Sequence, residues 1–318
     1  MNLHQLDSLD VHPDAVKKLK NAGLKKLKDV AAHSSAELQK KTRLAASQIE
    51  NIQGQACKIL YPIIPSTALD RLNLATDKIP TGCDSIDKLL GGGFLCQSVT
   101  EITGESGAGK TQICIQLALT NQLPREGNKR LNSLYICTED VFPTQRLLQM
   151  EHATRKRHPH MSRHRFMDHI FIEHLSDKDQ LLATLENRVP RLLDGGQTNL
   201  IILDSVTAVF RGQDECLNMI SRSKEIASIG LCLHRLAVRY RICVVCINQV
   251  TADMRLGSLE TWQPALGLTW SNLINTRLQV KRQNQESLLR TMSVCFAPHL
   301  PASSCGYTIT HEGVASVL

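Results

Sequence analysis

The sequence lacks three features of secreted and membrane proteins: a leader, an apolar run of membrane length and disulfide spacing. Residues 1–10 contain no basic stretch followed by an apolar core, and no apolar run is long enough to span a bilayer. We therefore expect a soluble chain that is not secreted. The eleven cysteines are scattered, and several lie within apolar runs, which predicts free thiols in a reducing intracellular compartment.

A zinc site is also not indicated. Cys243 and Cys246 have C-x-x-C spacing, but neither a second pair nor a nearby histidine completes a ligand set. Both lie within a continuous apolar run, so we interpret them as part of a buried strand. Internal repeats and low-complexity tracts are likewise missing.

The composition indicates a globular chain. With 318 residues, of which 42% are hydrophobic, there is room for one large α/β domain and a small extra one. The 37 Lys and Arg residues exceed the 30 Asp and Glu residues, which gives a formal net charge of +7. This mild basic excess favours polyanionic partners.

The first 61 residues predict a small all-α domain of helix-hairpin-helix type. Apolar residues recur at helical spacing on both sides of Gly23, which indicates a turn between two short helices. Two Ser-x-x-Glu segments, 34–37 and 47–50, have the spacing of a capping box. We therefore expect helices to begin at both segments.

Basic residues crowd the first of these hairpins, and two interpretations stay open. The lysines could form a surface for nucleic-acid backbone, since phosphate contacts require cations but little sequence readout, or they could be a solvated helix face. A second basic stretch at 155–165 could contact nucleic acid or an import receptor, or could be a solvated loop. The hairpin residues are Lys17, Lys18, Lys20, Lys25, Lys26 and Lys28.

The remainder of the chain predicts a linker and a large α/β domain. Prolines at 62 and 65 interrupt the helical pattern, so residues 62–80 are the predicted linker and 81–318 the core. Strand-length apolar runs alternate with helical patterns, which is typical of βα units in a mostly parallel, doubly wound sheet. These runs are 98–103, 134–138, 170–174, 200–204 and 242–248; shorter runs at 276–280, 291–296 and 307–310 predict an antiparallel extension.

Residues 104–111 read G-E-S-G-A-G-K-T and match the P-loop pattern G-x-x-x-x-G-K-[ST]. Glycines let several backbone N–H groups point into one concavity at a helix N-terminus, where they can hold a phosphate. The lysine adds a positive charge for the β- and γ-phosphates, and the threonine hydroxyl can ligate Mg²⁺. The predicted nucleotide-binding residues here are Gly104, Glu105, Ser106, Gly107, Ala108, Gly109, Lys110 and Thr111.

Two further strand-like runs end in carboxylates. Residues 200–204 are four apolar residues and an Asp, which is typical of a Walker-B strand whose carboxylate, here Asp204, holds Mg²⁺ through water. Glu139 follows another such run and is the candidate general base for the attacking water. The alternatives are a strand that ends in Asp by chance and, for Glu139, a cap on the next helix.

A third run ends in amides. Gln249 follows it directly. Its side chain could form hydrogen bonds with a γ-phosphate, and the conformation of the next segment could then depend on whether that phosphate is bound. That segment, 251–272, carries Trp262, Trp270 and Arg255 and has little secondary-structure signal. We expect it to be a mobile loop.

Seven motifs, in order along nearly the whole chain, resemble the RecA-like recombinase family in its eukaryotic homologous-recombination branch. They are residues 81–93, 104–111, 110–114, 122–124, 135–139, 200–205 and 248–250. The resemblance implies a RecA-like P-loop ATPase core joined to the small helical domain, with ATP and Mg²⁺ as cofactors. It also implies that Lys110 and Thr111 bind the triphosphate and Mg²⁺, that Glu139 is the catalytic carboxylate and that Arg146 stacks on adenine.

The resemblance further implies partners and a cellular site. It indicates a sister recombinase paralogue in a heterodimer, the main recombinase, and single-stranded or branched DNA, in the nucleus and also in the cytoplasm. Two DNA-binding loops would fall at about 211–224 and 251–272. The candidate DNA-binding residues are Arg211, Arg222, Lys224 and Arg255.

Three departures from the family pattern concern filament formation. Filament-forming members carry Phe-x-x-Ala in the linker, where residues 65–68 read Pro-Ser-Thr-Ala, and loss of such an aromatic anchor removes an interface hot spot. Asn272 replaces a histidine that reads the neighbouring subunit's γ-phosphate, and Phe296 replaces an Asp of the ATP cap. These departures predict a chain that does not polymerise by itself.

The sequence thus favours a slow, DNA-dependent ATPase subunit of a repair complex. In this interpretation ATP and Mg²⁺ at Lys110, Thr111 and Asp204 order Gln249 and the loop after it. Two alternatives stay open: a filament-forming strand-exchange recombinase, and a non-hydrolysing interaction subunit that holds ATP as a structural ligand.

Overall fold

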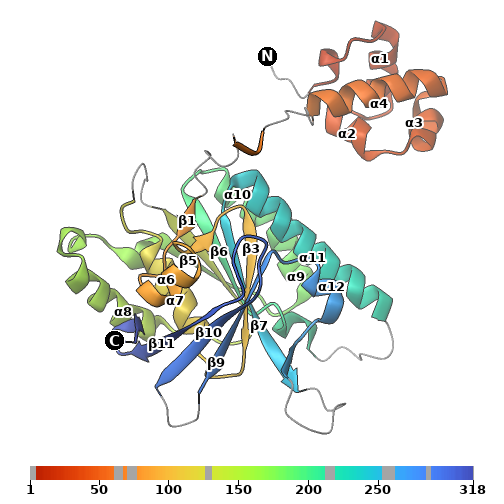
Figure 1. Ribbon diagram of the computed structural model, residues 1–318. Coiled ribbons are helices and arrows are strands. Elements are labelled where there is room, and N and C mark those ends of the chain that lie inside the picture. Colours follow the sequence, from red (N-terminus) through yellow and green to blue (C-terminus); the bar gives the residue numbers. More distant parts are fainter. Residues whose placement is uncertain are drawn as a thin grey trace. The chain divides into compact units, whose positions relative to one another are not determined.

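The computed structural model describes residues 5–60, 67–69, 77–125, 131–211, 219–252, 262–283 and 288–317. The chain divides into two compact units, Met1–Ala75 and Thr76–Leu318, which are helical and α/β respectively (Figure 1). The linker predicted at 62–80 lies mostly outside the described residues. Its end, Lys78–Ile79, forms β1 and pairs with β2 (Phe94–Leu95) in the second unit. Within the described ranges, every helix is too short or too polar to cross a membrane.

The first unit is a bundle of short helices around one hydrophobic core. After a 3-10 turn, η1 (Leu6–Ser8), come α1 (Pro13–Asn21), α2 (Leu27–Ala32), α3 (Ser35–Thr42) and α4 (Ala46–Leu60). Apolar side chains spaced at helical intervals meet in the centre, among them Leu19, Leu27, Val30, Ile49 and Ile52. Gly23 has a φ of 83° in the turn between α1 and α2, a conformation that glycine adopts without strain.

The predicted helix starts are half right. At α3 the Ser34 hydroxyl accepts from the Glu37 N–H at 3.3 Å, and the Glu37 carboxylate accepts from the Ser34 N–H at 2.9 Å, as a capping box requires. The second box is wrong because α4 already begins at Ala46 and Ser47 lies inside it. There the side chain of Gln48 accepts from the Ala45 N–H at 3.1 Å instead.

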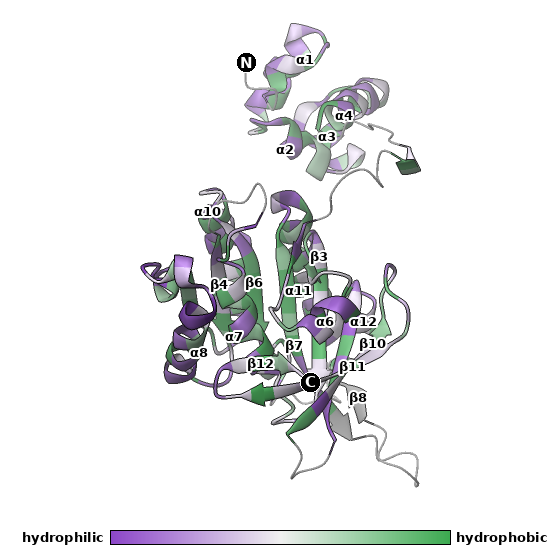
Figure 2. Cartoon of the chain, turned by 60° about the vertical axis from the view of Figure 1, so that its left-hand side comes forward, coloured by the Kyte–Doolittle hydropathy of each residue, from purple (hydrophilic) through white to green (hydrophobic). Residues whose placement is uncertain are grey.

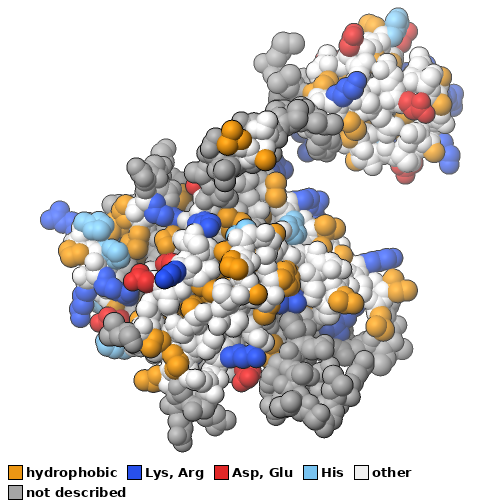
Figure 3. Space-filling view, in the orientation of Figure 1, with side chains coloured by type: hydrophobic (Ala, Val, Ile, Leu, Met, Phe, Trp, Pro, Cys, Tyr) orange, Lys and Arg blue, Asp and Glu red, His pale blue; other side chains and the backbone are white. Residues whose placement is uncertain are grey.

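The lysines of the first hairpin are all exposed. On the visible face of this unit, basic and acidic side chains are interspersed (Figure 3), and Lys20 pairs with Asp7 at 2.6 Å. Exposure is expected both for a nucleic-acid surface and for a solvated helix face, so the nucleic-acid surface stays a prediction.

The second unit is built on one mixed sheet. Its spatial order is β12-β11-β10-β9-β3-β7-β6-β4-β5, and β8 pairs with β7 outside this path. The strands β3, β4, β5, β6, β7 and β9 are parallel, which confirms the predicted α/β fold. The bounds are β3 (Ser98–Gly104), β4 (Asn132–Cys137), β5 (Ile170–His174), β6 (Thr198–Asp204), β7 (Cys243–Ala252), β8 (Trp262–Pro264), β9 (Thr276–Arg282), β10 (Leu289–Phe296), β11 (Ser304–Thr310) and β12 (Gly313–Ser316).

The antiparallel extension begins one strand later than expected. Strand β9 pairs with β3 in parallel, and the antiparallel pairings of the extension begin between β9 and β10 and continue through β11 and β12. The connection from β7 to β9 contains the helix α12 (Gly267–Ser271), so the chain crosses over the sheet and re-enters it in the original direction. The expectation of an antiparallel strand at 276–280 is therefore wrong.

Helices cover both faces of the sheet (Figure 1). The helices α6 (Asp84–Leu89), α7 (Lys110–Thr120) and α8 (Thr144–Arg157) contribute to one hydrophobic core, and α9 (Lys178–Ala183), α10 (Val189–Leu193), α11 (Met219–Tyr240) and α12 to the other. A π-helical turn, η4 (Thr184–Arg188), joins α9 to α10, and the 3-10 turns η2 (Pro159–Met161), η3 (Phe166–His169) and η5 (Ala208–Phe210) lie in connections. Figure 2 shows how apolar the central strands between these layers are.

The C-x-x-C pair lies within β7, as predicted. Cys243 and Cys246 are fully buried, the first in one hydrophobic core and the second in the other. Because strand side chains alternate between faces, residues three positions apart point to opposite sides of the sheet. The two thiols therefore cannot ligate one metal ion.

The capping box at α3 yields a test of local stability. Substituting Ser34→Ala removes the acceptor for the Glu37 N–H, and such a loss costs about 0.5–2 kcal/mol. Native-state hydrogen exchange of the α3 amides should show faster exchange by the corresponding factor. Ser47→Ala is the matched control, since it lies inside α4 and alanine favours helices by about 0.5 kcal/mol or less. Equal effects of the two changes on their helices would contradict the assignment.

Candidate nucleotide-binding site

The P-loop connects the carboxyl end of β3 to the first residue of α7. Gly109 precedes α7 with a φ of 102°, and a Cβ added there would lie 2.3 Å from Ile309 Cδ1. A Cβ on Gly104 would lie 2.2 Å from the Val280 carbonyl oxygen. Gly104 leaves no room for a side chain because the backbone of β9 lies against it, and Gly109 has a φ that glycine adopts without strain.

The loop borders a cavity of about 460 Å³, which is within the usual size range of ligand sites. Ser106, Gly107, Gly109, Lys110 and Thr111 line it on the P-loop side, while Gly104, Glu105 and Ala108 shape the loop without lining the cavity. Across from the loop lie Glu139, Asp204 and Gln249. The parallel strands β3, β4, β6 and β7 thus bring their carboxyl ends together at one edge, as doubly wound sheets do at ligand sites.

Lys110 and Asp204 carry the charges of the cavity wall. Lys110 Nζ donates to the carbonyl oxygens of Gly104 at 2.7 Å and Glu105 at 2.8 Å. Burial lowers the pKa of Lys110, although the charges of Asp204 and Glu139 oppose this change. Burial likewise raises the pKa of Asp204 above its usual 3.8, despite the hydrogen bonds that it accepts.

The side chains around Asp204 fit a magnesium site. Asp204 Oδ2 accepts hydrogen bonds from Thr111 Oγ1 at 2.8 Å and from the Tyr135 hydroxyl at 2.7 Å. The Thr111 hydroxyl would ligate Mg²⁺ directly, while Asp204, which accepts a hydrogen bond from that hydroxyl, would hold the ion through water.

The predicted catalytic residues meet a residue predicted for DNA binding. Gln249 Nε2 donates to Glu139 Oε2 at 3.0 Å. The Arg211 guanidinium forms an ion pair with Glu139 and a hydrogen bond with Gln249. Arg211 follows η5 directly, so this end of the predicted loop at 211–224 lies at the cavity.

Other predicted residues lie elsewhere. Arg146, predicted to stack on adenine, does not line the cavity; it bonds to Gln112 at 2.6 Å and to the carbonyl oxygens of Thr310 and His311 at 2.7 and 2.8 Å. Arg222 and Lys224 lie in the helix α11, which begins at Met219. Arg255, Pro65 and Ser66 fall outside the described residues. Sequence reasoning also missed Arg290 and Ile309, which line the cavity from β10 and β11.

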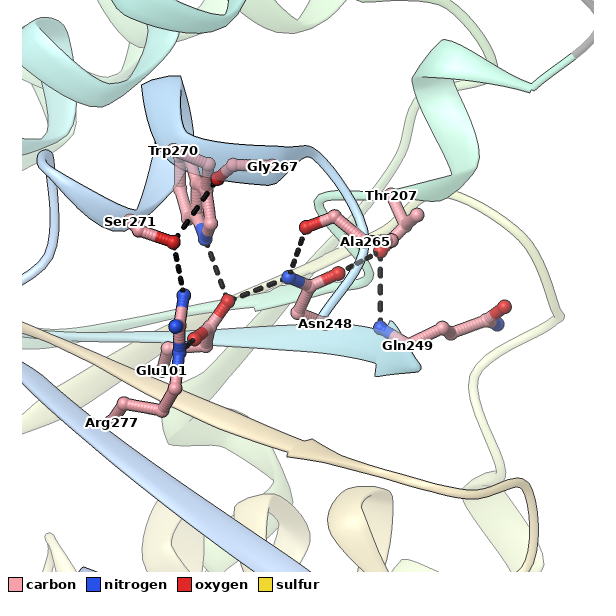
Figure 4. A network of polar contacts seen from close by, with 9 residues as sticks. All are labelled: Glu101, Thr207, Asn248, Gln249, Ala265, Gly267, Trp270, Ser271 and Arg277. Carbon is pink, nitrogen blue, oxygen red and sulfur yellow. Dashed lines mark hydrogen bonds and ion pairs between the residues drawn. The ribbon is translucent and has the colours of Figure 1, made fainter. Parts of the chain in front are cut away.

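A buried network next to the cavity was missed as well (Figure 4). Its centre is Glu101 in β3, which has no exposed surface and contacts Asn248, Trp270 and Arg277. A single charged residue inside an otherwise uncharged strand was the available signal, since buried carboxylates occur only when they are paired. Residues 253–261 of the expected mobile loop lie outside the described residues, whereas its described ends form the end of β7, β8 and α12.

A model of one protein family, described as Rad51, matches residues 73–317. The chain belongs to the Rad51 family. It is 37% identical to the "DNA repair protein XRCC3" of Bos taurus over 97% of each chain. It is also 32% identical to the "DNA repair protein XRCC3 homolog" of Arabidopsis thaliana, over 76% of this chain and 93% of that protein. To the "DNA repair and recombination protein RadA" of Aeropyrum pernix it is 28% identical, over 96% and 94% respectively.

The raised pKa of Asp204 predicts a pH-dependent cost to stability. The pKa of Asp204 in the folded chain lies above the value of 3.8 that it has in the unfolded chain. The free energy of unfolding therefore falls as the pH rises from 3.8 through the folded-state pKa. The total loss is about 1.4 kcal/mol for each unit by which the folded-state pKa exceeds the unfolded-state pKa. Asp204→Asn should therefore unfold at a higher temperature than wild type at pH 7 without nucleotide, and the gain should shrink as the pH falls toward 3.8. Asp140→Asn, at an exposed carboxylate of the same cavity, is the control. A gain that is independent of pH would contradict this account.

Proposed function

We propose that the protein is an ATP-binding subunit of homologous-recombination repair of DNA double-strand breaks, with slow, DNA-dependent hydrolysis. One observation carries the proposal: the P-loop, Asp204 and the Glu139–Gln249 pair line one cavity at the carboxyl ends of four parallel strands. The repair role is supported by the Rad51 family membership and by the names of the relatives.

The chain's own residues are placed where they could hold the phosphates of a nucleotide. The backbone N–H groups at the start of α7 would receive the phosphates, and Lys110 Nζ would exchange the carbonyl oxygens of Gly104 and Glu105 for phosphate oxygens. Thr111 and Asp204 would hold Mg²⁺, which when bound neutralises charge on the phosphates. Glu139 would orient and deprotonate the attacking water.

The contacts of Glu139 support slow turnover. Its carboxylate is occupied by Arg211 and by Gln249 Nε2, so an attacking water would have to displace one of these partners before Glu139 could accept a hydrogen bond from it. Arg211 is also the first residue of the predicted DNA loop. DNA phosphates that compete for Arg211 would release Glu139, which gives a physical basis for dependence on DNA.

We further propose a heteromeric assembly. The linker sequence at 65–68 lacks the aromatic residue with which filament-forming members plug into the next subunit, so a different chain, a sister recombinase paralogue, is the expected partner. Through this heterodimer the protein would assist the main recombinase on single-stranded or branched DNA, in the nucleus and also in the cytoplasm.

The lysine of the P-loop provides the first test of the proposal. Lys110→Ala removes a charged hydrogen-bond donor, and such a loss costs about 1.5–3 kcal/mol, so ATP affinity measured by calorimetry should fall by about 10- to 150-fold. Binding of DNA or of a co-purified partner should then no longer respond to ATP. Lys88→Ala, an exposed lysine of the same unit, should change neither. Unchanged ATP affinity and unchanged partner binding in Lys110→Ala would refute the gating role.

The pairing of Arg211 with Glu139 provides a second test. An exposed ion pair contributes about 0.2–1 kcal/mol, so Arg211→Ala should raise phosphate release without DNA by up to about fivefold, and DNA should stimulate the variant less than wild type. Arg188→Ala, which breaks another exposed Arg–Glu pair, is the matched control. A rate that stays the same or falls would contradict the inhibitory role of Arg211, and equal rates of wild type and Glu139→Gln would leave Glu139 no catalytic role.

The alternative of a strand-exchange recombinase makes a different prediction. Purified protein with single-stranded DNA and ATP would then form long regular filaments in the electron microscope. Short or irregular complexes are expected if the chain needs a partner subunit.

A further inference from the structure

Glu101 uses both of its carboxylate oxygens inside the protein (Figure 4). Oε1 accepts from Asn248 Nδ2 at 2.6 Å and from Trp270 Nε1 at 2.7 Å, and Oε2 pairs with Arg277 Nε. The Glu101 side chain has no exposed surface, and 12% of the Arg277 side chain is exposed. A charge so deeply buried is tolerated only while its partners stay in place, since removing one leaves an uncompensated charge.

Two of the partners stand at opposite ends of the segment 249–270, which contains most of the second predicted DNA loop. Asn248 directly precedes Gln249 on β7, and Trp270 lies in α12 where the segment ends. Glu101 Oε1 therefore joins the start of the segment to its end through a single atom.

Further bonds fix Asn248 to the backbone of Gln249. The Thr207 hydroxyl donates to Asn248 Oδ1 at 2.6 Å and accepts from the Gln249 N–H at 3.1 Å. Asn248 Nδ2 also donates to the Ala265 carbonyl at 2.9 Å, and the Ala265 N–H donates to the Gln249 carbonyl at 2.9 Å. The backbone of Gln249 and the amide of Asn248 are thus connected through shared hydrogen-bond partners.

Arg277, on the other side of Glu101, also has further contacts. Arg277 Nη2 donates to Ser271 Oγ at 3.0 Å, Ser271 Oγ donates to the Gly267 carbonyl at 3.0 Å, and the guanidinium lies 5.2 Å from the ring centre of Phe296. The helix α12 is therefore held to β9 and β3 by polar contacts as well as by the burial of Trp270. Networks of this kind have few alternative arrangements that leave every group paired.

We propose that Glu101 is a positioning residue that transmits the nucleotide state of Gln249 to Trp270 and α12. The inference rests on the proposed function, because it takes the cavity to be a nucleotide site. A shift of Gln249 toward a γ-phosphate displaces Asn248, and Glu101 then carries Trp270 and Arg277 with it, since leaving any of them unpaired is costly. If the Glu101–Arg277 pair only stabilised the fold, the conformation of α12 would not depend on nucleotide.

Trp270 itself is the reporter for the test. Trp262→Phe in the full chain leaves Trp270 as the only tryptophan. In this reference chain a non-hydrolysable ATP analogue with Mg²⁺ should change the Trp270 emission spectrum. Calorimetry measures the affinity for the analogue separately from this response.

The paired substitution Glu101→Met with Arg277→Met removes both charges together and leaves neither unpaired. In the reference background it should still bind the analogue, but the change in Trp270 emission should be lost, because the connection between Gln249 and α12 is removed. Thr103→Val is the matched control, because it lies two positions along β3, is buried, and has a hydroxyl for which the described residues contain no hydrogen-bond partner. The control should respond as the reference does.

A milder variant keeps the test decisive if the paired one does not fold. Trp270→Phe retains an aromatic ring and removes the donated hydrogen bond together with part of the ring volume, and hydrogen exchange of the α12 amides then replaces fluorescence. The variant should lose the nucleotide-dependent protection of α12 that wild type shows. Protection equal to wild type would overturn the inference.

The outcomes distinguish a failure of the proposed function from a failure of the role proposed for Glu101. If the reference chain binds no nucleotide, the proposed function fails, and the inference fails with it. If it binds nucleotide and Trp270 does not respond, or if the paired variant responds as strongly as the reference, only the role of Glu101 fails.

Discussion

A single buried carboxylate determines how the centre of the large unit can be arranged. Glu101 lies in β3, and its partners come from β7, β9 and α12. Since an unpaired ion in the interior costs several kcal/mol, these elements must keep their register with one another. The P-loop follows three residues after Glu101 on the same strand, so the network also fixes where the phosphate-binding loop begins. The position of the site thus depends on an interaction that takes no direct part in it.

In the cavity, by contrast, the residues proposed to bind a ligand lower the stability of the folded chain. Burial lowers the pKa of Lys110 and raises the pKa of Asp204, so both groups are held where their charged forms are least stable. The fold tolerates this because Lys110 has two carbonyl acceptors and Asp204 has two hydroxyl donors. Phosphates and a metal ion would supply the missing compensation. The same residues that weaken the folded chain are therefore the ones that can bind such a ligand strongly.

The sequence predicts best those features that depend on the spacing of neighbouring residues. The P-loop and the Walker-B strand are continuous segments, and apolar runs of strand length located β3, β4, β5, β6 and β7 with small errors at their ends. The start of α4 was misplaced because two Ser-x-x-Glu segments look alike, and only one lies where a helix begins. The direction of β9 could not be inferred from its own residues, since it depends on the short helix α12 in the preceding connection.

The side-chain contacts of several residues with partners far away in the sequence could not be predicted. The hydrogen bonds of Arg146 to Gln112 and to the carbonyl oxygens of Thr310 and His311 could not be foreseen, and its stacking on adenine stays a prediction. Arg211 was predicted from its place at the start of a loop, whereas its contacts are with Glu139 and Gln249. Trp270 was predicted to lie in a loop because α12 is only one turn and a half in length, too short for a periodic signal.

The C-terminal strands complete the P-loop. Ile309 Cδ1 of β11 lies 2.3 Å from the place of a Cβ at position 109, and the Tyr307 hydroxyl donates to the Ala108 carbonyl at 3.2 Å. Arg146 ties α8 to the end of β11, and Gln112, its partner, stands in the first turn of α7. The antiparallel extension is therefore one wall of the cavity as well as an edge of the sheet. The conformation of the P-loop depends on residues some two hundred positions later in the chain, because those residues determine how closely the loop can approach β11.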